Sequence, residues 1–275
     1  MRSEPRGLED TSPGSEDTDP LDLPTSPGKP QYEVVQTLGE GGMGKVCLAV
    51  QRGPIKDVHK FVVLKRMHPW IRLQDNQVRG FVKEARIAMR LNHRNIVHTD
   101  SVDVEEGEPS IVMEFLEGAS LSELANALGS DASWDERLLL VGAMCDALSG
   151  LHYVHEFSDF DGAAMGLVHR DFKPGNVFVT FEGEVKVLDF GVAKVNAGGL
   201  DASTGYSIKG TMAYMAPEVA ASSDGIDRRA DLFSVGVSLW RLVTSKPYWP
   251  ELAPVDLLRR VASGELPELE PPDDV

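Results

Sequence analysis

Between residues 32 and 116 the sequence is dominated by short apolar runs of the kind that form β-strands. Some runs alternate apolar and polar positions, and others are short β-type stretches bounded by turn residues. The expected strands are 32–38, 46–50, 61–65, 96–97 and 110–116. One segment differs, because 81–91 has helical spacing, with its apolar face expected at Phe81, Ala85, Ala88 and Met89.

After residue 117 the spacing of apolar residues changes to that of helices. Helices are expected at 121–128, 135–155 and 255–262. In the longest of them, one apolar stripe is expected to face the core, formed by Leu138, Val141, Cys145, Leu148 and His152. The chain therefore changes from a β-rich part to a helical part at a hinge near residue 117.

One hairpin is expected inside the helical part, and it brings polar side chains together. Two β-type runs, 177–181 and 185–188, flank a Glu-Gly-Glu turn. Pairing of these runs places Asn176 and Asp189 side by side at one end, with Asp171 one short loop away. Mg²⁺ prefers such oxygen ligands together with phosphate, so this stretch indicates phosphoryl transfer.

A glycine-rich loop at 39–46 follows the first expected strand. Its spacing fits the G-x-G-x-x-G of a dinucleotide-binding fold and nearly fits the G-x-x-x-x-G-K-[ST] of a P-loop. Both of these need a helix after the loop, with its N-terminus facing the phosphates, whereas 46–50 is a β-type run. Val46 also replaces the hydroxyl residue of the P-loop. A strand–loop–strand hairpin whose backbone N–H groups cover nucleotide phosphates is therefore favoured.

The composition is that of a globular protein, with 42% hydrophobic and 25% charged residues, but the net charge of −16 is unusual. The segments 1–30 and 265–275 carry nine of these negative charges between them. Residues 1–30 contain six prolines and almost no large apolar side chain, so we expect a disordered leader. Residues 265–275 form an acidic, proline-rich tail. The acidic balance argues against a nucleic-acid or anionic-membrane partner.

Cysteine usage and the absence of targeting signals indicate the cytoplasm. Cys47 and Cys145 lie in a strand-like and a helix-like run, and both are expected to be buried free thiols in a reducing compartment. No apolar run approaches the length of a membrane span, and no signal-peptide-like region follows Met1. We therefore expect a cytoplasmic chain without a membrane span.

Two motifs carry a resemblance to a known family. Residues 169–176 match H-R-D-x-x-x-x-N and residues 189–191 read D-F-G, so they resemble the catalytic and metal-binding loops of protein kinases. The chain is similar to the eukaryotic-like (Hanks-type) serine/threonine kinase domains of bacteria. This resemblance implies an α+β, two-lobed fold. It places a β-rich small lobe at 31–117, a helical large lobe at 118–264, and ATP between them.

The resemblance also implies roles for the residues that match the family motifs. Asp171 would accept the proton of the substrate hydroxyl, and Lys173 would neutralise the migrating phosphoryl group. Lys65 ends a strand similar to the family's V-A-I-K strand and would bind the α- and β-phosphates, while Glu84 would pair with it. The implied ligands of Mg²⁺ or Mn²⁺ are Asn176 and Asp189.

The implied ATP-binding residues come from the first strands, the glycine-rich loop and the hinge. Met113 would be the gatekeeper, and the backbone from Glu114 to Leu116 would contact the adenine edge. Val63 stands where the family usually has alanine, which would tighten the pocket without removing any chemistry. The implied set is Leu38, Gly39, Gly41, Gly44, Val46, Val63, Lys65, Met113, Glu114, Leu116 and Phe178.

The segment 191–218 resembles a kinase activation segment with its A-P-E close. Autophosphorylation is expected at Ser203 or Thr204, because a phosphate there would pair with Arg170 and order the segment. Thr211 is expected instead to be a structural hydroxyl near the catalytic base.

Two acids outside the reaction centre have structural roles by resemblance. Asp231 would bond back to the catalytic loop, and Glu218 would form a buried ion pair with a later arginine. After Val261 the chain has no lysine or arginine, so Glu218 is expected to lack that partner. By the same resemblance, the last helices of the family's large lobe are expected to be missing as well. We therefore expect an incomplete kinase domain of lowered stability that tends to associate.

The expected function is a protein serine/threonine kinase that acts on protein substrates and self-associates for trans-autophosphorylation. Lys173, two residues after the base, and Thr211, after Gly210, resemble the serine/threonine branch and not the tyrosine branch. The alternative is a pseudokinase scaffold, or an inactive truncated fragment that acts by binding. Pseudokinases usually lose the strand lysine, the base or the metal aspartate, and all three are present in this sequence.

Overall fold

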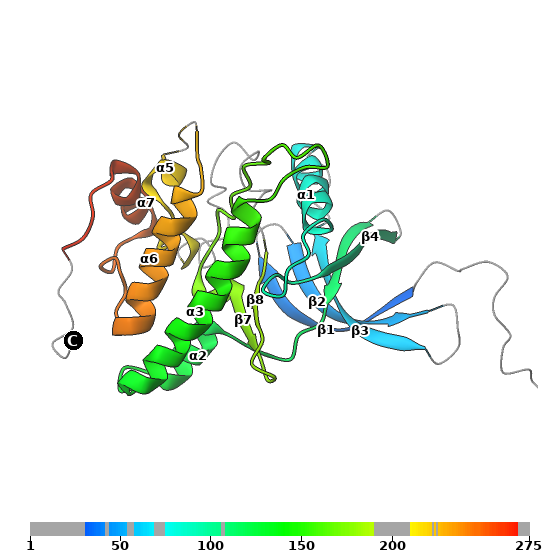
Figure 1. Cartoon of the computed structure of the whole chain (residues 1–275), viewed down its shortest axis with the longest axis horizontal. Helices are drawn as coiled ribbons and strands as arrows, with labels where there is room; N and C mark the ends of the chain where they lie inside the picture. Colours follow the sequence, from blue (N-terminus) through cyan, green and yellow to red (C-terminus); the bar gives the residue numbers. More distant parts are fainter. Residues whose placement is uncertain are drawn as a thin grey trace, which may run out of the picture.

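The computed structural model describes residues 31–41, 44–53, 58–68, 75–105, 108–189, 210–221, 223 and 225–268. The expected leader at 1–30 lies outside them. Figure 1 shows two lobes, one with a large sheet and helix α1, the other with most of the helices and a small sheet. The chain passes from one lobe to the other after β5. The expected α+β, two-lobed fold is confirmed.

The small lobe is built on a five-stranded antiparallel sheet in the order β1-β2-β3-β5-β4. Its strands are β1 (Gln31–Gly41), β2 (Gly44–Arg52), β3 (His59–Met67), β4 (Thr99–Glu105) and β5 (Glu108–Glu114). Helix α1 (Asp75–Ala88) follows β3 and rests on β4. Val46 lies opposite Lys65, and Val63 lies opposite Met113. Because paired residues share a face of a sheet, these four side chains lie on one side of it.

The sheet curls until its two edge strands meet. The hydroxyl of Tyr32 on β1 donates a hydrogen bond to the carboxylate of Asp103 on β4. Burial, and then this carboxylate, raise the pKa of Tyr32 above its usual value. Ala49, Val62 and Leu64 are fully buried in a cluster that Tyr32 covers. The second face of the sheet therefore has an apolar core of its own.

The large lobe combines helices with a three-stranded sheet in the order β6-β7-β8. Its strands are β6 (Gly118–Ser120), β7 (Val177–Thr180) and β8 (Val185–Val187), and the 3₁₀ turn η2 (Pro174–Asn176) precedes β7. Its helices are α2 (Leu121–Leu128), α3 (Trp134–His155), α5 (Pro217–Ala220), α6 (Arg229–Thr244) and α7 (Pro254–Ser263). Ser120 and Ser133 begin α2 and α3 with capping boxes, which satisfy the first free N–H groups.

Helix α3 turns a different face to the core from the one expected. The buried apolar side chains of its core-facing side are Leu140, Met144, Ala147, Leu151 and Val154. The predicted stripe of Leu138, Val141, Cys145, Leu148 and His152 was wrong, since Leu138 is half exposed and Cys145 and His152 are exposed. Helix α3 is apolar on both sides, so the spacing could not identify the buried one. Cys47 is a buried free thiol as expected, whereas Cys145 is a free thiol on the surface.

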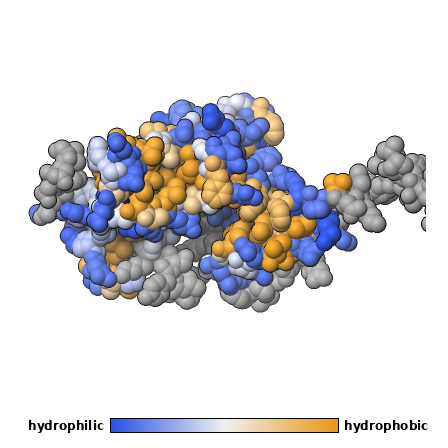
Figure 2. Space-filling view, turned by 90° about the horizontal axis from the view of Figure 1, so that it is seen from below, coloured by the Kyte–Doolittle hydropathy of each residue, from blue (hydrophilic) through white to orange (hydrophobic). Residues whose placement is uncertain are grey.

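By length and composition alone, α3 is the single helix within the described residues that could cross a membrane. The expectation that no run would approach this length was therefore wrong. Helix α3 packs against β7, β8 and α6, which accounts for part of its apolar character without a membrane. Figure 2 shows further apolar surface on both lobes, and the exposed apolar residues of α3 are Trp134, Leu138 and Leu139.

Two boundaries in the small lobe differ from those expected. Residues 96–97 are not a strand of the large sheet, because Ile96 forms an isolated bridge with Val187 and the sheet strand is β4. Helix α1 ends at Ala88, so Met89 lies in the following turn and is 47% exposed. In the stretch after α1, Leu91 and Ile96 thus pack into the core of the large lobe, while Val97 packs with Ile111 and Met113 of the sheet.

Candidate active site

The catalytic loop is held in place by a carboxylate from helix α6. Asp231 is completely buried and accepts hydrogen bonds from the backbone N–H groups of His169 and Arg170, both at 2.8 Å. Its Oδ2 also lies 2.7 Å from Nε2 of His155, at the end of α3. Arg170 has a φ of 63°, a conformation that a residue with a side chain keeps only when its surroundings hold it firmly.

Asp171 lies at the centre of a small polar group at the end of this loop. The Nζ of Lys173 is 3.2 Å from Oδ2 of Asp171 and 2.8 Å from the hydroxyl of Thr211. Asn176 donates from Nδ2 to the backbone oxygen of Asp171 at 2.8 Å and to its Oδ2 at 3.2 Å. The structure therefore brings together four residues that the sequence placed in one site.

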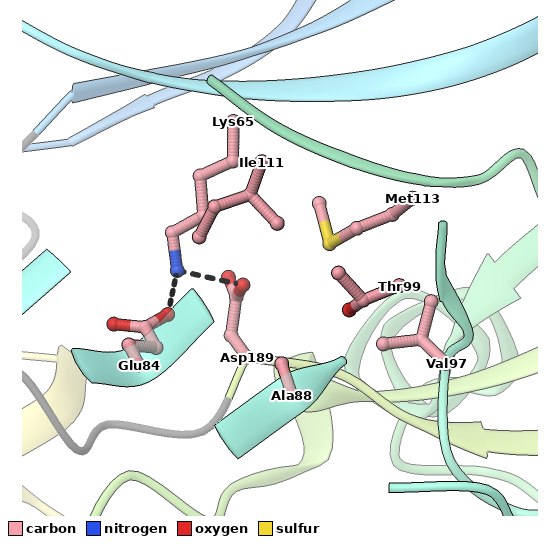
Figure 3. A pocket seen from close by; sticks show the side chains of 8 residues that line it. All are labelled: Lys65, Glu84, Ala88, Val97, Thr99, Ile111, Met113 and Asp189. Carbon is pink, nitrogen blue, oxygen red and sulfur yellow. Dashed lines mark hydrogen bonds and ion pairs between the residues drawn. The ribbon is translucent and has the colours of Figure 1, made fainter. Parts of the chain in front are cut away.

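Lys65 joins the two lobes through a pair of carboxylates. Its Nζ lies 2.7 Å from Oε1 of Glu84 on α1 and 2.9 Å from Oδ1 of Asp189 after β8 (Figure 3). Burial lowers the pKa of Lys65, but Asp189 and Glu84 outweigh it, and the net pKa is raised. Burial raises the pKa of Asp189, yet Lys65 outweighs it, and the net pKa is lowered. Lys65 and Asp189 are therefore both charged near neutral pH.

A pocket opens directly beside this ion-pair group (Figure 3). Its charged side is made by the three residues just described, and its other side is apolar apart from one hydroxyl. The lining residues are Lys65, Glu84, Ala88, Val97, Thr99, Ile111, Met113 and Asp189. The site thus combines a fixed positive charge with an apolar wall.

The residues expected to bind adenine come from both lobes and from the link between them. Val63, Met113 and Leu116 belong to one apolar cluster. Leu38 on β1 is 46% exposed, and Phe178 lies on β7 of the large lobe.

The backbone N–H groups at the link differ in whether they are already hydrogen-bonded. The N–H of Glu114 donates to the backbone oxygen of His98 at 3.0 Å. The N–H of Leu116 has no backbone acceptor within the described part of the chain. A ligand with an acceptor atom in its plane could take that bond.

The glycine-rich loop joins β1 to β2 and is not followed by a helix. This excludes the dinucleotide-fold and P-loop alternatives. A Cβ on Gly44 would lie 1.9 Å from the backbone oxygen of Arg66, so only glycine fits there. Gly39 and Gly41 have open space around them, and Nε2 of His68 lies 2.8 Å from the backbone oxygen of Gly41.

The regulatory and structural residues from the sequence are placed only in part. Ser203 and Thr204, like Phe190 and Gly191, lie outside the described residues. Burial lowers the pKa of Arg170, against the opposing effect of Asp231, and none of the described carboxylates forms an ion pair with its guanidinium. Glu218 is half-buried on α5 and likewise has no ion pair within the described residues.

Two residues that support the site were not identified from the sequence. His155, the last residue of α3, contacts the buried Asp231. Asn95 is 3% exposed, and its Nδ2 donates to Val185 O at 2.9 Å. Its backbone oxygen accepts from the N–H of Val187 at 2.9 Å. An Asn next to Ile-Val is a weak signal, because its partners lie about ninety residues away.

Comparisons with known proteins agree with this geometry. Residues 32–263 match the family model described as the protein kinase domain. The chain is 37% identical over 235 residues to the tyrosine-protein kinase MasK of Myxococcus xanthus, covering 86% of this chain and 36% of MasK. It is 34% identical over 219 residues to the serine/threonine-protein kinase Pkn1 of Myxococcus xanthus, covering 78% of this chain and 29% of Pkn1. This chain thus spans about a third of the length of these relatives.

A solved structure supports the same assignment. The chain resembles the crystal structure of a cysteine-to-alanine mutant of the Mycobacterium tuberculosis PknI kinase domain, with a TM-score of 0.58 and 26% sequence identity. The alignment covers 80% of this chain and 76% of that one. Because the family model spans most of the sequence and the fold agrees with it, the chain belongs to the protein kinase domain family.

Proposed function

We propose that this chain transfers the γ-phosphoryl group of ATP to serine or threonine hydroxyls of proteins. One observation supports this most strongly: the described site contains two clusters of charged side chains that contact one another. Lys65 contacts Glu84 and Asp189, while Asp171 contacts Lys173. A scaffold that only binds would have no need to hold all five charges in these positions.

Asp171 is the group that we propose orients the substrate hydroxyl. Asn176 and Lys173 fix its carboxylate from two sides. As the hydroxyl oxygen bonds to the γ-phosphorus and the bond to ADP breaks, the hydroxyl proton passes to this carboxylate. A positioned base contributes about 10²–10⁴ in rate. Lys173, which also bonds Thr211, places a positive charge beside the transferring group.

Lys65 would hold the α- and β-phosphates of the nucleotide. Its raised pKa keeps the ammonium charged, and Glu84 and Asp189 fix its position before any ligand binds. The open N–H of Leu116, beside the apolar surface of Val63 and Met113, suits the edge and face of an adenine ring. Both ends of ATP thus have matching groups.

Asn176 and Asp189 fit the hard-cation site that Mg²⁺ or Mn²⁺ would need. The amide nitrogen of Asn176 is already used, which leaves its oxygen as the available atom. Oδ1 of Asp189 accepts from Lys65, while Oδ2 has no hydrogen-bond partner within the described residues. A bound divalent ion supplies charge neutralisation of the phosphates.

We further propose that autophosphorylation at Ser203 or Thr204 regulates the enzyme. The half-buried guanidinium of Arg170 has no described ion-pair partner, so it could accept a phosphate at modest cost. Modification of one copy by another would require the chain to self-associate. Free thiols and use of ATP fit a role in the cytoplasm.

Transfer of label from γ-labelled ATP to a basic protein tests the function. We expect wild-type protein to label the substrate, and Asp189→Asn to abolish labelling. Acid hydrolysis of the product then identifies the modified residue, and phosphoserine or phosphothreonine is expected. Phosphotyrosine would instead indicate the tyrosine specificity for which MasK is named, and no label at all would favour a pseudokinase.

A further inference from the structure

A loop of the large lobe contacts the turn that follows α1, the helix that carries Glu84. This insert loop (residues 157–166) follows α3 and runs beside α1 (Figure 1). Arg90, in the turn after α1, donates from Nη2 to Oδ1 of Asp159 at 2.7 Å. Its guanidinium carbon lies 4.4 Å from the ring centre of Phe160 and 5.3 Å from that of Phe157. One side chain thus makes an ion pair and two cation–π contacts with the loop.

The insert loop has a defined shape of its own. The N–H of Asp159 donates to Ala163 O at 2.8 Å, and the N–H of Met165 donates to Phe157 O at 3.0 Å. The N–H of Phe160 donates to Oδ1 of Asp159 at 2.7 Å. That hydrogen bond and then Arg90 hold the pKa of Asp159 below its usual value. The loop therefore presents a fixed carboxylate to Arg90.

Burial does not explain why Phe160 lies where it does. Its surface is 91% exposed, so packing into a core contributes almost nothing to its position. Its closest described ring or cation contact is the guanidinium of Arg90. The contact between Phe160 and Arg90 is therefore a specific feature of the interface between the insert loop and the end of α1.

The stretch just beyond Arg90 is tied to the same part of the large lobe. The N–H of Asn92 donates to the hydroxyl of Tyr153 at 3.2 Å, and the ring of His93 stacks on Tyr153 at 5.0 Å. Tyr153 in turn contacts Phe157, the first residue of the insert loop, edge to face at 5.8 Å. Arg90 is thus the first of several contacts that fix the C-terminal end of α1.

This contact joins two segments that are close in sequence to the two halves of the site. Arg90 is six residues beyond Glu84, and the insert loop leads directly into the catalytic loop at His169 and Asp171. We infer that the insert loop is a positioning device: Arg90, held by Asp159 and Phe160, fixes α1 so that Glu84 reaches Lys65. This inference rests on the proposed kinase function, in which Lys65 must be oriented toward the phosphates. Arg90 is a positioning residue, because it acts through Glu84.

Steady-state kinetics of Arg90→Ala give the first test, with Arg86→Ala as the matched control. Arg86 is an exposed arginine on the same helix and makes no ion pair or hydrogen bond with the described residues. We expect Arg90→Ala to lower kcat about tenfold, within the usual range for loss of a coupling contact. Arg86→Ala should stay within about twofold. Phe160→Ala, at an exposed position that the fold does not depend on, should lower kcat in the same direction.

Repeating the Arg90→Ala substitution in a Glu84→Gln variant separates positioning of Glu84 from a general loss of activity. If Arg90 acts through Glu84, Arg90→Ala should have little further effect on kcat once Glu84→Gln is present. If the fold-decreases in kcat caused by the two substitutions multiply in the double variant, Arg90 acts independently of Glu84 and the inference fails. Equal kcat in Arg90→Ala and Arg86→Ala would also overturn it.

Hydrogen exchange gives a readout that does not depend on activity. Amides of α1 should exchange faster in Arg90→Ala than in wild type or Arg86→Ala, while amides of α6 stay unchanged. Failure of the proposed function would appear as wild-type protein without transfer, yet this difference in α1 would remain. Unchanged exchange in α1 would refute the positioning role whatever the activity.

Discussion

His169 shows how a single buried side chain ties the catalytic loop to the protonation state of the protein. It is completely buried, its Nε2 lies 3.0 Å from Leu188 O, and its Nδ1 accepts from the N–H of Asp171 at 3.2 Å. These two bonds require a neutral ring with its proton on Nε2. Burial lowers the pKa of His169, and Asp231 and Asp171 offset this only in part.

The free energy of unfolding should therefore fall as the pH drops below about 6.5, the ordinary pKa of histidine. The folded-state pKa is lowered, so the unfolded chain takes up a proton in this range while folded His169 does not. The slope is at most about 1.4 kcal/mol per pH unit for this one group. Urea denaturation between pH 7.5 and 5.5 measures it. His169→Gln should flatten the slope, and His152→Gln, at an exposed position, should leave it unchanged; equal slopes in both variants would contradict the assignment.

The two charged residues central to the reaction should be separable from the fold. We expect Lys65→Met and Asp171→Asn each to reduce phosphoryl transfer at least about 100-fold, since a positioned base or phosphate ligand commonly contributes that much. Circular dichroism should show unchanged secondary structure. A variant that keeps more than a few per cent of wild-type transfer would show that its residue has another role.

At this scale, motif spacing was a good guide to which residues gather. Lys65, Glu84 and Asp189 are far apart in sequence yet meet within hydrogen-bond distance. His155 and Asn95 were missed, because their importance depends on partners that only the folded chain brings near. Local sequence carries no record of such partners.

Among the elements, α3 shows where sequence patterns are ambiguous. Its limits were predicted to within one residue, because Ser133 caps it and its composition favours a helix. Its orientation was not, since it carries large apolar residues on both sides, including Leu139 at 75% exposure. The short apolar pair at 96–97 was likewise taken for a strand, although Ile96 only bridges to Val187. Period alone cannot tell which neighbour buries an apolar face.

The same helix offers a matched pair of glycines for a stability test. A Cβ at Gly150 would lie 2.6 Å from the backbone oxygen of Asn95, whereas Gly142 has nothing within 4 Å. Gly150→Ala should destabilise the protein by about 1–3 kcal/mol through overpacking. Gly142→Ala should stabilise it by about 0.5–1 kcal/mol, because alanine is the better helix former. Urea denaturation compares them, and a neutral or stabilising Gly150→Ala would show that α3 and Asn95 are not in close contact.

At the scale of the whole molecule, the two lobes and their order were predictable because mainly strand-like patterns give way to mainly helical ones near residue 117. The relation of the lobes was not, since it depends on the curl of the sheet and on contacts such as Lys65 with Asp189. Net charge is a further property at this scale. A protein with a net charge of −16 attracts positively charged partners over a range of about one Debye length.

Basic protein substrates should therefore be favoured, and the preference should weaken with salt. We expect kcat/KM for a lysine-rich protein to fall several-fold between 50 mM and 300 mM NaCl, because screening removes electrostatic steering. An acidic protein such as casein should show no fall, or a small rise. Parallel decreases for both substrates would mean that salt acts on the enzyme itself and not on the encounter.

Leu91 and Ile96 belong by sequence to the small lobe, yet both are almost fully buried in the main core cluster of the large lobe. A chimera that joined two relatives at residue 117 would take Leu91 and Ile96 from one protein. The residues at positions 151 and 187, which belong to the same core cluster, would come from the other protein. Residue 117 separates the lobes along the backbone, but the core of the large lobe contains side chains from both sides of it. In recombination or lobe exchange, residues 89–97 should therefore come from the same protein as the α3 and β8 residues against which they pack.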